Sequence, residues 1–143
     1  MKKKIVVAMS GGVDSSVSAA LLQEQGYEVI GVTMRVWKNT QDSAVRDAQL
    51  MAEKLQITHY VLDLREIFKK QIVDYFINEY LLGRTPNPCV ECNRYIKFGE
   101  LLNWAKSIGA DQLATGHYAQ LVWENNRYLL KKSKSSNKDQ TYP

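Results

Sequence analysis

Cysteine, histidine and proline are all scarce in this 143-residue chain, and their scarcity limits what the protein can be. The chain has two cysteines, two histidines and three prolines. A structural zinc site takes four ligands, usually two pairs of cysteines. Two cysteines do not supply that set, and His59 and His117 lie at predicted strand ends without metal-ligand spacing to them. An intrachain zinc is therefore not expected, although a ligand set shared with a second chain stays open.

Long apolar runs are missing too. No stretch approaches the roughly 18 consecutive apolar residues that a membrane span requires. The apolar part of the basic N-terminus covers only residues 5–9, which is shorter than the core of a signal peptide. We therefore predict a cytoplasmic protein with no membrane partner. Thiols stay reduced in that compartment, so the two cysteines are not expected to form a structural disulfide.

Acidic residues are slightly outnumbered, since 19 Lys and Arg against 15 Asp and Glu give a formal charge of +4. A surplus of this size allows a polyanionic partner without requiring one. The basic side chains gather in two places. One group lies near the C-terminal end and consists of Lys131, Lys132, Lys134 and Lys138. The other group brackets the cysteines and consists of Arg84, Arg94 and Lys97.

Hydrophobic periodicity predicts alternating strands and helices within one domain, residues 1–143. Short apolar runs predict strands at residues 4–9, 28–36, 59–64 and 111–118. Apolar stripes at helical spacing predict helices near residues 14–26, 42–57, 66–82 and 96–110. Such alternation forms right-handed βαβ units, so we predict an α/β fold with a doubly wound, mainly parallel sheet and helices on both faces.

The end of the chain follows another pattern. Residues 119–123 and 127–131 are predicted to form a short C-terminal β-hairpin. A basic tail follows over residues 132–143, and we expect it to be flexible because no element is available to pack it down. Upstream, Pro86 and Pro88 are expected to end the helix before them and to hold an extended loop.

Chemistry is expected at one edge of the predicted sheet. In doubly wound sheets, ligands bind beyond the carboxyl ends of the strands. Residues 10–16 follow the first predicted strand, Met34 ends the second, and Gly116 and His117 follow the fourth. The same edge therefore gathers three separate candidate segments.

The first segment reads "SGGVDSS" and spans residues 10–16. Glycines let backbone N–H groups approach an anion closely, and a following helix adds its positive N-terminal end. The hydroxyls of Ser10, Ser15 and Ser16 can donate to phosphate oxygens. Asp14 fits an anion site either with Mg²⁺ or as a carboxylate that orders the loop. The alternative is a plain glycine-rich turn capped by Asp14 or Ser15.

The spacing matches neither a P-loop ending in Gly-Lys-Ser/Thr nor a dinucleotide fingerprint. Instead, "SGGVDSS" after a first strand resembles the pyrophosphate loop of the ATP pyrophosphatases. These enzymes split ATP into AMP and pyrophosphate while adenylating a substrate. The resemblance implies an adenine nucleotide alpha hydrolase-like fold with ATP and Mg²⁺ as cofactors. The motif does not distinguish among the members of this superfamily, which include GMP, NAD and argininosuccinate synthetases and tRNA-thiolating enzymes.

The second motif is "RTPNPCVECNRYIKF", residues 84–98, which carries both cysteines. A thioredoxin-type redox pair would open a helix directly after a strand, without two prolines before it. A pair of small buried side chains is a further alternative. A third interpretation is a reactive thiol that meets the substrate. It is favoured by Arg94, Lys97 and a helix predicted to start near residue 96, because cations and a helix N-terminus stabilise a thiolate. We therefore predict Cys92 to be the more reactive thiol.

Together with "GADQLATGHYA" and "NKDQTY", the cysteine motif closely resembles the tRNA-specific 2-thiouridylases, from Ile5 to Tyr142. The resemblance implies replacement of the C2 oxygen of the wobble uridine of tRNA by sulfur. ATP adenylates that oxygen and pyrophosphate leaves; sulfur carried as a cysteine persulfide then displaces AMP. The implied partners are tRNA and a sulfur-donor protein, either a cysteine desulfurase or a sulfur relay protein.

The resemblance also assigns roles to residues. It implies that Cys92 and Asp14 are catalytic, with Cys89 as a stand-in for a second catalytic cysteine or as a ligand of an iron–sulfur cluster whose third cysteine is missing here. ATP contacts fall on Ala8, Met9, Ser10, Gly11, Gly12, Val13, Asp14, Ser15, Met34 and Gly116. Asn87, Pro88 and Cys89 fall on the segment that meets the target base, and His117, Lys138, Asp139 and Gln140 on positions that touch tRNA.

Members of this family continue further, with a second catalytic cysteine that carries the persulfide and with domains that grip tRNA. We therefore expect a truncated or split gene product, or a fragment. Two alternative functions follow from that expectation. One is a free-standing ATP-binding adenylation domain that needs a second chain for sulfur and tRNA. The other is a non-catalytic remnant that still binds nucleotide or RNA.

Overall fold

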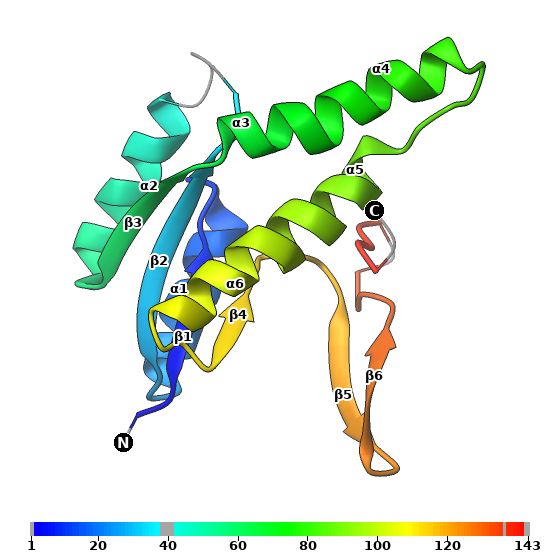
Figure 1. Ribbon diagram of the computed structural model, residues 1–143. Helices are drawn as coiled ribbons and strands as arrows, with labels where there is room; N and C mark the ends of the chain where they lie inside the picture. The colour runs from blue at the N-terminus through cyan, green and yellow to red at the C-terminus, as the bar shows by residue number, and fades with distance from the viewer. Residues whose placement is uncertain (1, 38–41, 136, 142–143) are drawn as a thin grey trace.

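A computed structural model describes residues 2–37, 42–135 and 137–141 of the chain. Its centre is a parallel sheet of four strands in the order β3-β2-β1-β4 (Figure 1). The strands are β1 (Lys4–Ala8), β2 (Glu28–Arg35), β3 (Thr58–Asp63) and β4 (Gln112–Ala114). All three strand pairings are parallel. The predicted α/β fold class is confirmed.

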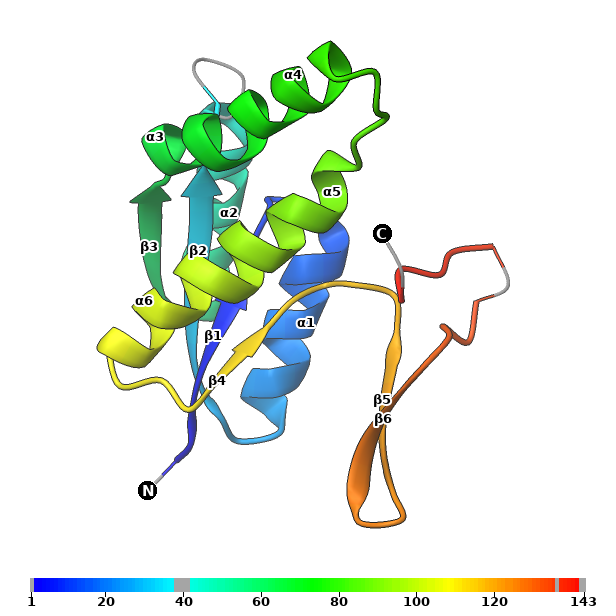
Figure 2. The ribbon, with the colours of Figure 1, turned by 45° about the vertical axis from the view of Figure 1, so that its right-hand side comes forward.

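Strand β1 lies in the middle of the sheet because its side chains are apolar on both faces. Ile5 and Val7 point to one face, where they pack with Ala19 of α1 (Val13–Glu24) and Ala48 of α2 (Asp42–Leu55). Val6 points to the other face and packs with Leu101 of α6 (Leu101–Ser107). Figure 2 shows the two groups of helices on opposite sides of the sheet. The predicted two-sided covering is confirmed.

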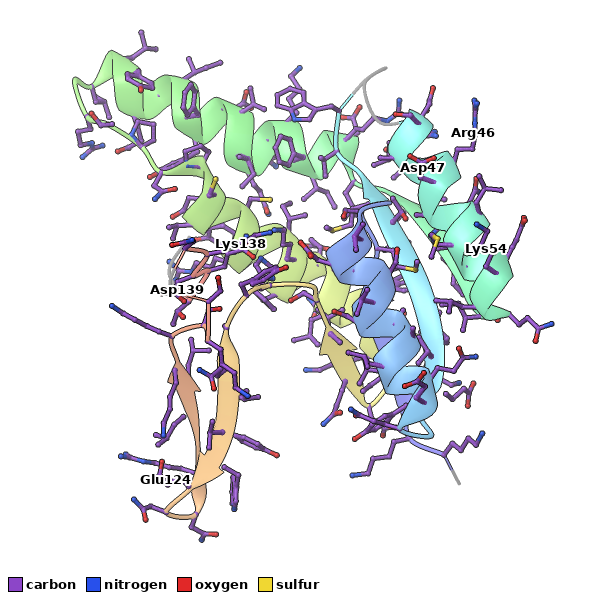
Figure 3. All side chains as sticks on the ribbon, turned by 180° about the vertical axis from the view of Figure 1, so that it is seen from behind. Arg46, Asp47, Lys54, Glu124, Lys138 and Asp139 are labelled. Carbon is purple, nitrogen blue, oxygen red and sulfur yellow. The ribbon has the colours of Figure 1, made fainter. Side chains whose placement is uncertain are left out.

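Helix α2 shows how the sequence divides inside from outside. Val45, Ala48 and Ala52 are buried at helical spacing. The charged side chains of the same helix stand on the opposite face, where Arg46 and Lys54 point away from the sheet (Figure 3). This division is the amphipathic pattern expected of a helix lying on a sheet.

Two glycines end helices where the sequence predicts it, but the start of α1 differs from expectation. Gly26 and Gly109 follow α1 and α6 with φ of +89° and +76°, the left-handed conformation of a helix C-terminus. At its start, α1 has Gly12 as N-cap with no side-chain cap. The prediction that Asp14 or Ser15 caps α1 is wrong, because both residues lie inside its first turn.

A long helical segment follows β3. It consists of α3 (Arg65–Phe68), η1 (Lys69–Val73) and α4 (Asp74–Leu81), where η marks a π-helical stretch. The predicted helix at 66–82 is confirmed in place, and its far end extends beyond the edge of the sheet (Figure 1). Within the described ranges, no helix combines the length and hydrophobicity that crossing a membrane would require.

The cysteines lie on helix rather than on a loop. A second continuous helical segment begins with α5 (Pro88–Glu91), continues as η2 (Cys92–Glu100) and ends as α6. Asn87 is the N-cap, its side chain accepting a hydrogen bond from the N–H of Val90 at 3.4 Å. The predicted extended loop is therefore wrong at Pro88. Proline at the first helical position needs no N–H partner, and asparagine before it is a preferred cap.

The two helical segments meet in a small core of their own. Phe68 and Ile72 from the first segment are buried together with Ile96 from the second. Cys92 packs against the same cluster. The cluster fixes the direction in which the cysteine-bearing helix approaches the sheet.

The C-terminal hairpin is confirmed, with β5 (Gln120–Glu124) and β6 (Arg127–Lys131) paired antiparallel. Asn125 and Asn126 form its turn with φ of +52° and +61°, as a type I′ turn requires. The hairpin stands away from the parallel sheet (Figure 2).

The tail after the hairpin does have partners, contrary to our expectation that nothing packs it down. The N–H of Gln140 donates to the carbonyl of Tyr118 at 2.8 Å, and the N–H of Tyr118 donates to Oε1 of Gln140 at 2.9 Å. These two bonds hold the tail against the segment that follows β4. Residues 136, 142 and 143 of the predicted tail lie outside the described residues, and its flexibility stays a prediction.

Leu101 tests the packing of α6 on the sheet, because its side chain is fully buried against Val6 and Val32. We expect Leu101→Ala to lower the free energy of unfolding by about 2–5 kcal/mol, since it leaves a cavity in the core. Chemical denaturation measures this. The control is Leu130→Ala at a position 59% exposed, and an equal loss in both variants would contradict the described core.

Candidate functional site

A cavity of about 400 Å³ opens at the carboxyl ends of β1, β2 and β4. This is the edge at which the sequence predicts a ligand site. Most of the predicted site residues line the cavity, although they come from five separate parts of the chain. They are Ala8, Met9, Ser10, Asp14, Ser15, Met34, Cys92, Gly116, His117, Lys138 and Gln140.

The remaining predicted site residues do not line this cavity. Val13 lines a shallower neighbouring cavity of about 560 Å³, which shares Asp14, Gly116 and His117 with the first. The others line neither cavity: Gly11, Gly12, Asn87, Pro88, Cys89 and Asp139. Among these, Cys89 is exposed. Asp139 orders the tail, with Oδ1 accepting from the N–H of Ser133 at 3.1 Å.

The serines of the glycine-rich loop bind the loop's own backbone. Oγ of Ser15 accepts from the N–H of Ser10 at 3.2 Å, and Oγ of Ser16 donates to the carbonyl of Gly12 at 2.9 Å. Ser16, predicted to donate to phosphate, is buried and lies outside the cavity. The groups left for an anion are the N–H groups of the first turn of α1, which have no partner within the helix.

Two glycines let three backbone segments meet at this loop. Gly11 has φ of +81°, and a Cβ there would lie 2.6 Å from the carbonyl oxygen of Ala44 in α2. A Cβ on Gly116 would lie 2.8 Å from the nitrogen of Ser15. Gly12 differs, because a Cβ there would have only the Ser10 hydroxyl as a neighbour, at 3.4 Å. Gly11 and Gly116 are therefore required by close packing, whereas Gly12 leaves open space in front of the helix.

Asp14 is held by two side chains from distant parts of the chain. The hydroxyl of Tyr118 donates to Oδ1 at 2.9 Å, and Nζ of Lys138 lies 3.1 Å from Oδ2. Lys138 also lies over the ring of Tyr118, 4.1 Å from its centroid. Figure 3 shows Lys138 on the tail, above the hairpin. These bonds, with Tyr118 first and Lys138 second, lower the pKa of the Asp14 carboxyl, so it is ionised at neutral pH.

His59 and His117 each form a hydrogen bond with a threonine hydroxyl. Oγ1 of Thr33 donates to the carbonyl of Met9 at 2.9 Å and lies 2.8 Å from Nε2 of His59. A hydroxyl has one proton, so His59 is the donor in the second bond. Nδ1 of His117 bonds the hydroxyl of Thr115 at 2.7 Å. Burial lowers the pKa of both imidazoles.

Within the part of the chain that the structure describes, no group of three His, Cys, Asp or Glu side chains could hold a metal. An iron–sulfur cluster takes four ligands, usually all cysteine, so two free cysteines do not fit one. Mg²⁺ differs, since it is commonly bound through one or two carboxylates together with substrate phosphates. Asp14 fits that pattern only with a phosphate ligand present.

The electrostatics of Cys92 differ from our prediction. Its thiol is half-buried in the cavity wall, and burial raises its pKa, with the charge of Lys97 acting in the opposite direction. The helix N-terminus is not beside it, because the helix begins at Pro88. The guanidinium of Arg94 lies over the ring of Tyr95, 5.2 Å from its centroid. The prediction of a thiol activated by Arg94 and a helix end is therefore wrong, and Cys89 is the more exposed thiol.

Sequence reasoning did not assign two threonines that the structure places at the site, Thr33 and Thr115. Lys97, which the sequence indicated only as a cation near the cysteines, lines the cavity as well. Tyr118 was missed as the partner of Asp14, although it stands next to a predicted site residue. Their contacts join positions far apart along the chain, 104 residues in the case of Tyr118 and Asp14. Periodicity and local motifs carry no signal for such contacts.

Tyr118 provides a test of the Asp14 cluster. Because its hydroxyl stabilises the ionised carboxylate, Tyr118→Phe should raise the pKa of Asp14 towards the ordinary value for aspartate. The bond stabilises the fold fully at pH values above the pKa that Asp14 has in the unfolded protein. This stabilisation is lost as the pH falls through the lower pKa that Asp14 has in the folded protein. NMR titration of the Asp14 carboxyl carbon measures the change. Tyr128→Phe, on the exposed hairpin, is the control, and an unchanged Asp14 midpoint in Tyr118→Phe would refute the contact.

Comparison with known proteins places the chain in a family. Residues 3–143 match the family model described as "tRNA methyl transferase HUP domain". The tRNA-specific 2-thiouridylase MnmA of Clostridium kluyveri is 59% identical over 153 residues, covering 99% of this chain and 43% of that protein. The Acetivibrio thermocellus protein of the same name is 55% identical over 155 residues, again covering 99% and 43%. The chain thus spans less than half the length of these curated relatives.

Solved structures agree on the fold. A predicted subunit of tRNA methyltransferase from Methanocaldococcus jannaschii matches with a TM-score of 0.57 and 26% identity, covering 80% of this chain and 52% of that one. The glutamine-dependent NAD⁺ synthetase of Acinetobacter baumannii matches with a TM-score of 0.58 and 22% identity, covering 80% and 22%, and supports the fold alone. The chain belongs to the tRNA methyl transferase HUP domain family, the family of the tRNA-specific 2-thiouridylases.

Proposed function

We propose that this chain is the ATP-binding, adenylating part of an enzyme that makes 2-thiouridine at the wobble position of tRNA. One observation carries the proposal: a single cavity joins the first turn of α1, the thiol of Cys92 and the predicted tRNA-contacting residues His117, Lys138 and Gln140. Nucleotide, thiol and RNA base would need to meet in one place for this reaction. Membership of the 2-thiouridylase family supports the same conclusion.

ATP is the nucleotide that we propose for the cavity. Its phosphates would lie at the N-terminus of α1, where N–H groups and the helix dipole favour anions. Ala8, Met9 and Met34 supply an apolar wall for the adenine. A volume of about 400 Å³ lies within the usual range for small-molecule sites. Mg²⁺, held by Asp14 and the phosphates, would neutralise charge on the leaving pyrophosphate.

The reaction would run in two steps. The C2 oxygen of the uridine attacks the α-phosphorus of ATP, and the bond to pyrophosphate breaks with its electron pair on the leaving group. The terminal sulfur of a persulfide then attacks C2, and the C2–O bond breaks so that AMP leaves with the oxygen. A second thiolate attacks the persulfide bond, which frees the thiolated base and leaves a disulfide. Cys92 is the thiol that we place at this centre.

Recognition of tRNA would use the start of the cysteine helix, the segment after β4 and the tail. Asn87, Pro88 and Cys89 form the start of that helix and would meet the target base. His117, Lys138 and Gln140 line the cavity and would contact the RNA, with Asp139 ordering the tail beside them. Basic side chains supply most non-specific affinity for phosphate backbones, so Lys138 and its neighbouring lysines would add to binding.

A second candidate is an adenylation domain that works with another chain. It is favoured because Cys89 is exposed and does not line the cavity, so among the described residues the cavity holds one thiol. Transfer of sulfur from a persulfide requires two. The second thiol and the sulfur would then come from a cysteine desulfurase or sulfur relay protein, or from a further polypeptide of the enzyme.

Gly12 tests the nucleotide site directly. A single Cβ at Gly12 fits, but the branched side chain of valine would fill the space in front of α1 where we place the phosphates. We therefore expect Gly12→Val to lose ATP binding in calorimetry while circular dichroism stays unchanged. Gly12→Ala is the graded control and should retain weakened binding. Unaltered ATP affinity in a folded Gly12→Val protein would refute the assignment.

Adenylation can be separated from sulfur transfer. If the chain adenylates uridine, pyrophosphate should be released from ATP only when the substrate tRNA is present, in about equal amount to the tRNA. The control is tRNA in which the wobble uridine is replaced by cytidine. No 2-thiouridine shift is expected in mercury-affinity gels until a sulfur donor and a second thiol are added. Release of pyrophosphate that does not depend on tRNA would contradict the proposed substrate.

A further inference from the structure

The π-helical stretch η2 sets the direction of the side chains that follow Cys92. It runs from Cys92 to Glu100, nine residues in the middle of an otherwise α-helical segment. In an α-helix, the fifth residue along lies about 140° around the axis, so positions 92 and 97 would face different ways. A π-turn closes after an additional residue and brings the fifth position back towards the first. Lys97 is the fifth residue after Cys92.

Two observations agree with this geometry. Cys92 and Lys97 both line the 400 Å³ cavity, whereas Ile96 between them is fully buried against Phe68 and Ile72. Gly99 lies in the π-helical stretch, where a Cβ would lie only 3.1 Å from the carbonyl oxygen of Arg94, five residues earlier. The absence of a side chain at position 99 therefore suits the π-helical path that brings Lys97 to the cavity.

Lys97 is half-buried, and within the described residues it makes no ion pair. Lys138, the other lysine of the cavity, is paired with Asp14. An ammonium removed from water without a carboxylate partner is costly unless another anion compensates it. Functional sites commonly accept that cost, because an unpaired charge is available for chemistry.

The other charged groups around Cys92 are few. From its own helix, Cys89 is the group besides Lys97 that contributes to the pKa of Cys92, which it raises. His117 lines the cavity from the segment after β4, and Asp14 and Lys138 neutralise one another. The cluster packed behind Cys92, which includes Phe68 and Ile72, is apolar. Lys97 is therefore the uncompensated cation on the cavity side of the thiol.

We infer that Lys97 is a positioning residue of the site: its ammonium, carried to the cavity by the π-helical turn, favours the thiolate of Cys92 over the thiol. Burial raises the pKa of Cys92, and the positive charge of Lys97 lowers it. Burial lowers the pKa of His117, and the same charge lowers it further. The inference rests on the proposed function only in taking Cys92 as the reacting thiol.

The rate of Cys92 alkylation tests the inference without ATP or tRNA. In a Cys89→Ser chain, Cys92 is the single thiol, and its reaction with iodoacetamide is followed from pH 6 to 10 by mass spectrometry. Adding Lys97→Met should move the profile to higher pH and slow labelling at pH 7.5 by about threefold to tenfold, because a smaller fraction of the thiol is ionised. Lys97→Arg should restore the original profile.

Arg94→Met is the matched control. It removes one positive charge from the same helical segment, but Arg94 is exposed, lies over Tyr95 and does not line the cavity. We expect its labelling profile to stay within twofold of the parent. A Lys97→Met profile that coincides with the parent, or an equal shift in Arg94→Met, would overturn the inference.

Histidine titration provides a second readout that does not depend on thiol accessibility. Proton NMR should show the pKa of His117 rising in Lys97→Met, because the repulsion between two cations is removed. His59 is an internal control, since Lys97 does not contribute to its pKa. If Lys97→Met does not fold, Lys97→Gln replaces it. A His117 pKa that moves no more than that of His59 would count against Lys97, and none of these results depends on whether the chain adenylates tRNA.

Discussion

The site depends on one place where the backbone leaves no room for a side chain. At Gly116, the segment after β4 approaches the nitrogen of Ser15 so closely that a Cβ would lie 2.8 Å from it. This contact joins the segment after β4 to the first turn of α1, which is far from it in sequence. It sets His117 and Tyr118 beside the first turn of α1, and Tyr118 then holds both Asp14 and, through Gln140, the tail.

A second requirement is the route by which the thiol reaches the same cavity. Asn87 and Pro88 start the helix early, and the apolar cluster around Ile96 fixes its direction. Within that helix, the π-helical stretch turns Lys97 to the cavity side while Ile96 stays in the core. Packing of Ile96 on one face of the helix and a change of helical period on the other thus place a half-buried thiol and a cation at the same cavity. Burial raises the pKa of Cys92, and the charge of Lys97 acts in the opposite direction.

The sequence predicts much of the fold because its signals are local. Apolar runs such as residues 5–7 mark strands buried on both faces, and Gly26 and Gly109 mark helix ends by a conformation that glycine adopts without strain. The prediction fails where two local signals compete. Prolines at 86 and 88 indicate a loop, yet Asn87 before Pro88 is also a good helix start, and tertiary packing of Ile96 favours the helix.

The candidate site is predicted in part for similar reasons. Its glycine-rich loop, Met34, Gly116 and Cys92 belong to motifs that can be read along the chain, and the structure brings them into one cavity. Tyr118 could not be assigned in the same way, and the sequence indicated Lys97 only as a cation near the cysteines. The position of Lys97 depends on a π-helical period that apolar spacing does not reveal, and the role of Tyr118 depends on a contact with Asp14. The ionisation of Cys92 depends on burial, which the sequence around it does not show.

We propose the cavity between α1, β4 and the cysteine helix as the nucleotide site. The test is amide NMR of the chain titrated with Mg²⁺ and a non-hydrolysable ATP analogue. We expect the largest shifts at the amides of residues 13–15, which begin α1, and smaller shifts at Met34, Lys97 and Gly116. Saturable shifts confined to the β5–β6 hairpin and the tail, with residues 13–15 unchanged, would contradict this proposal.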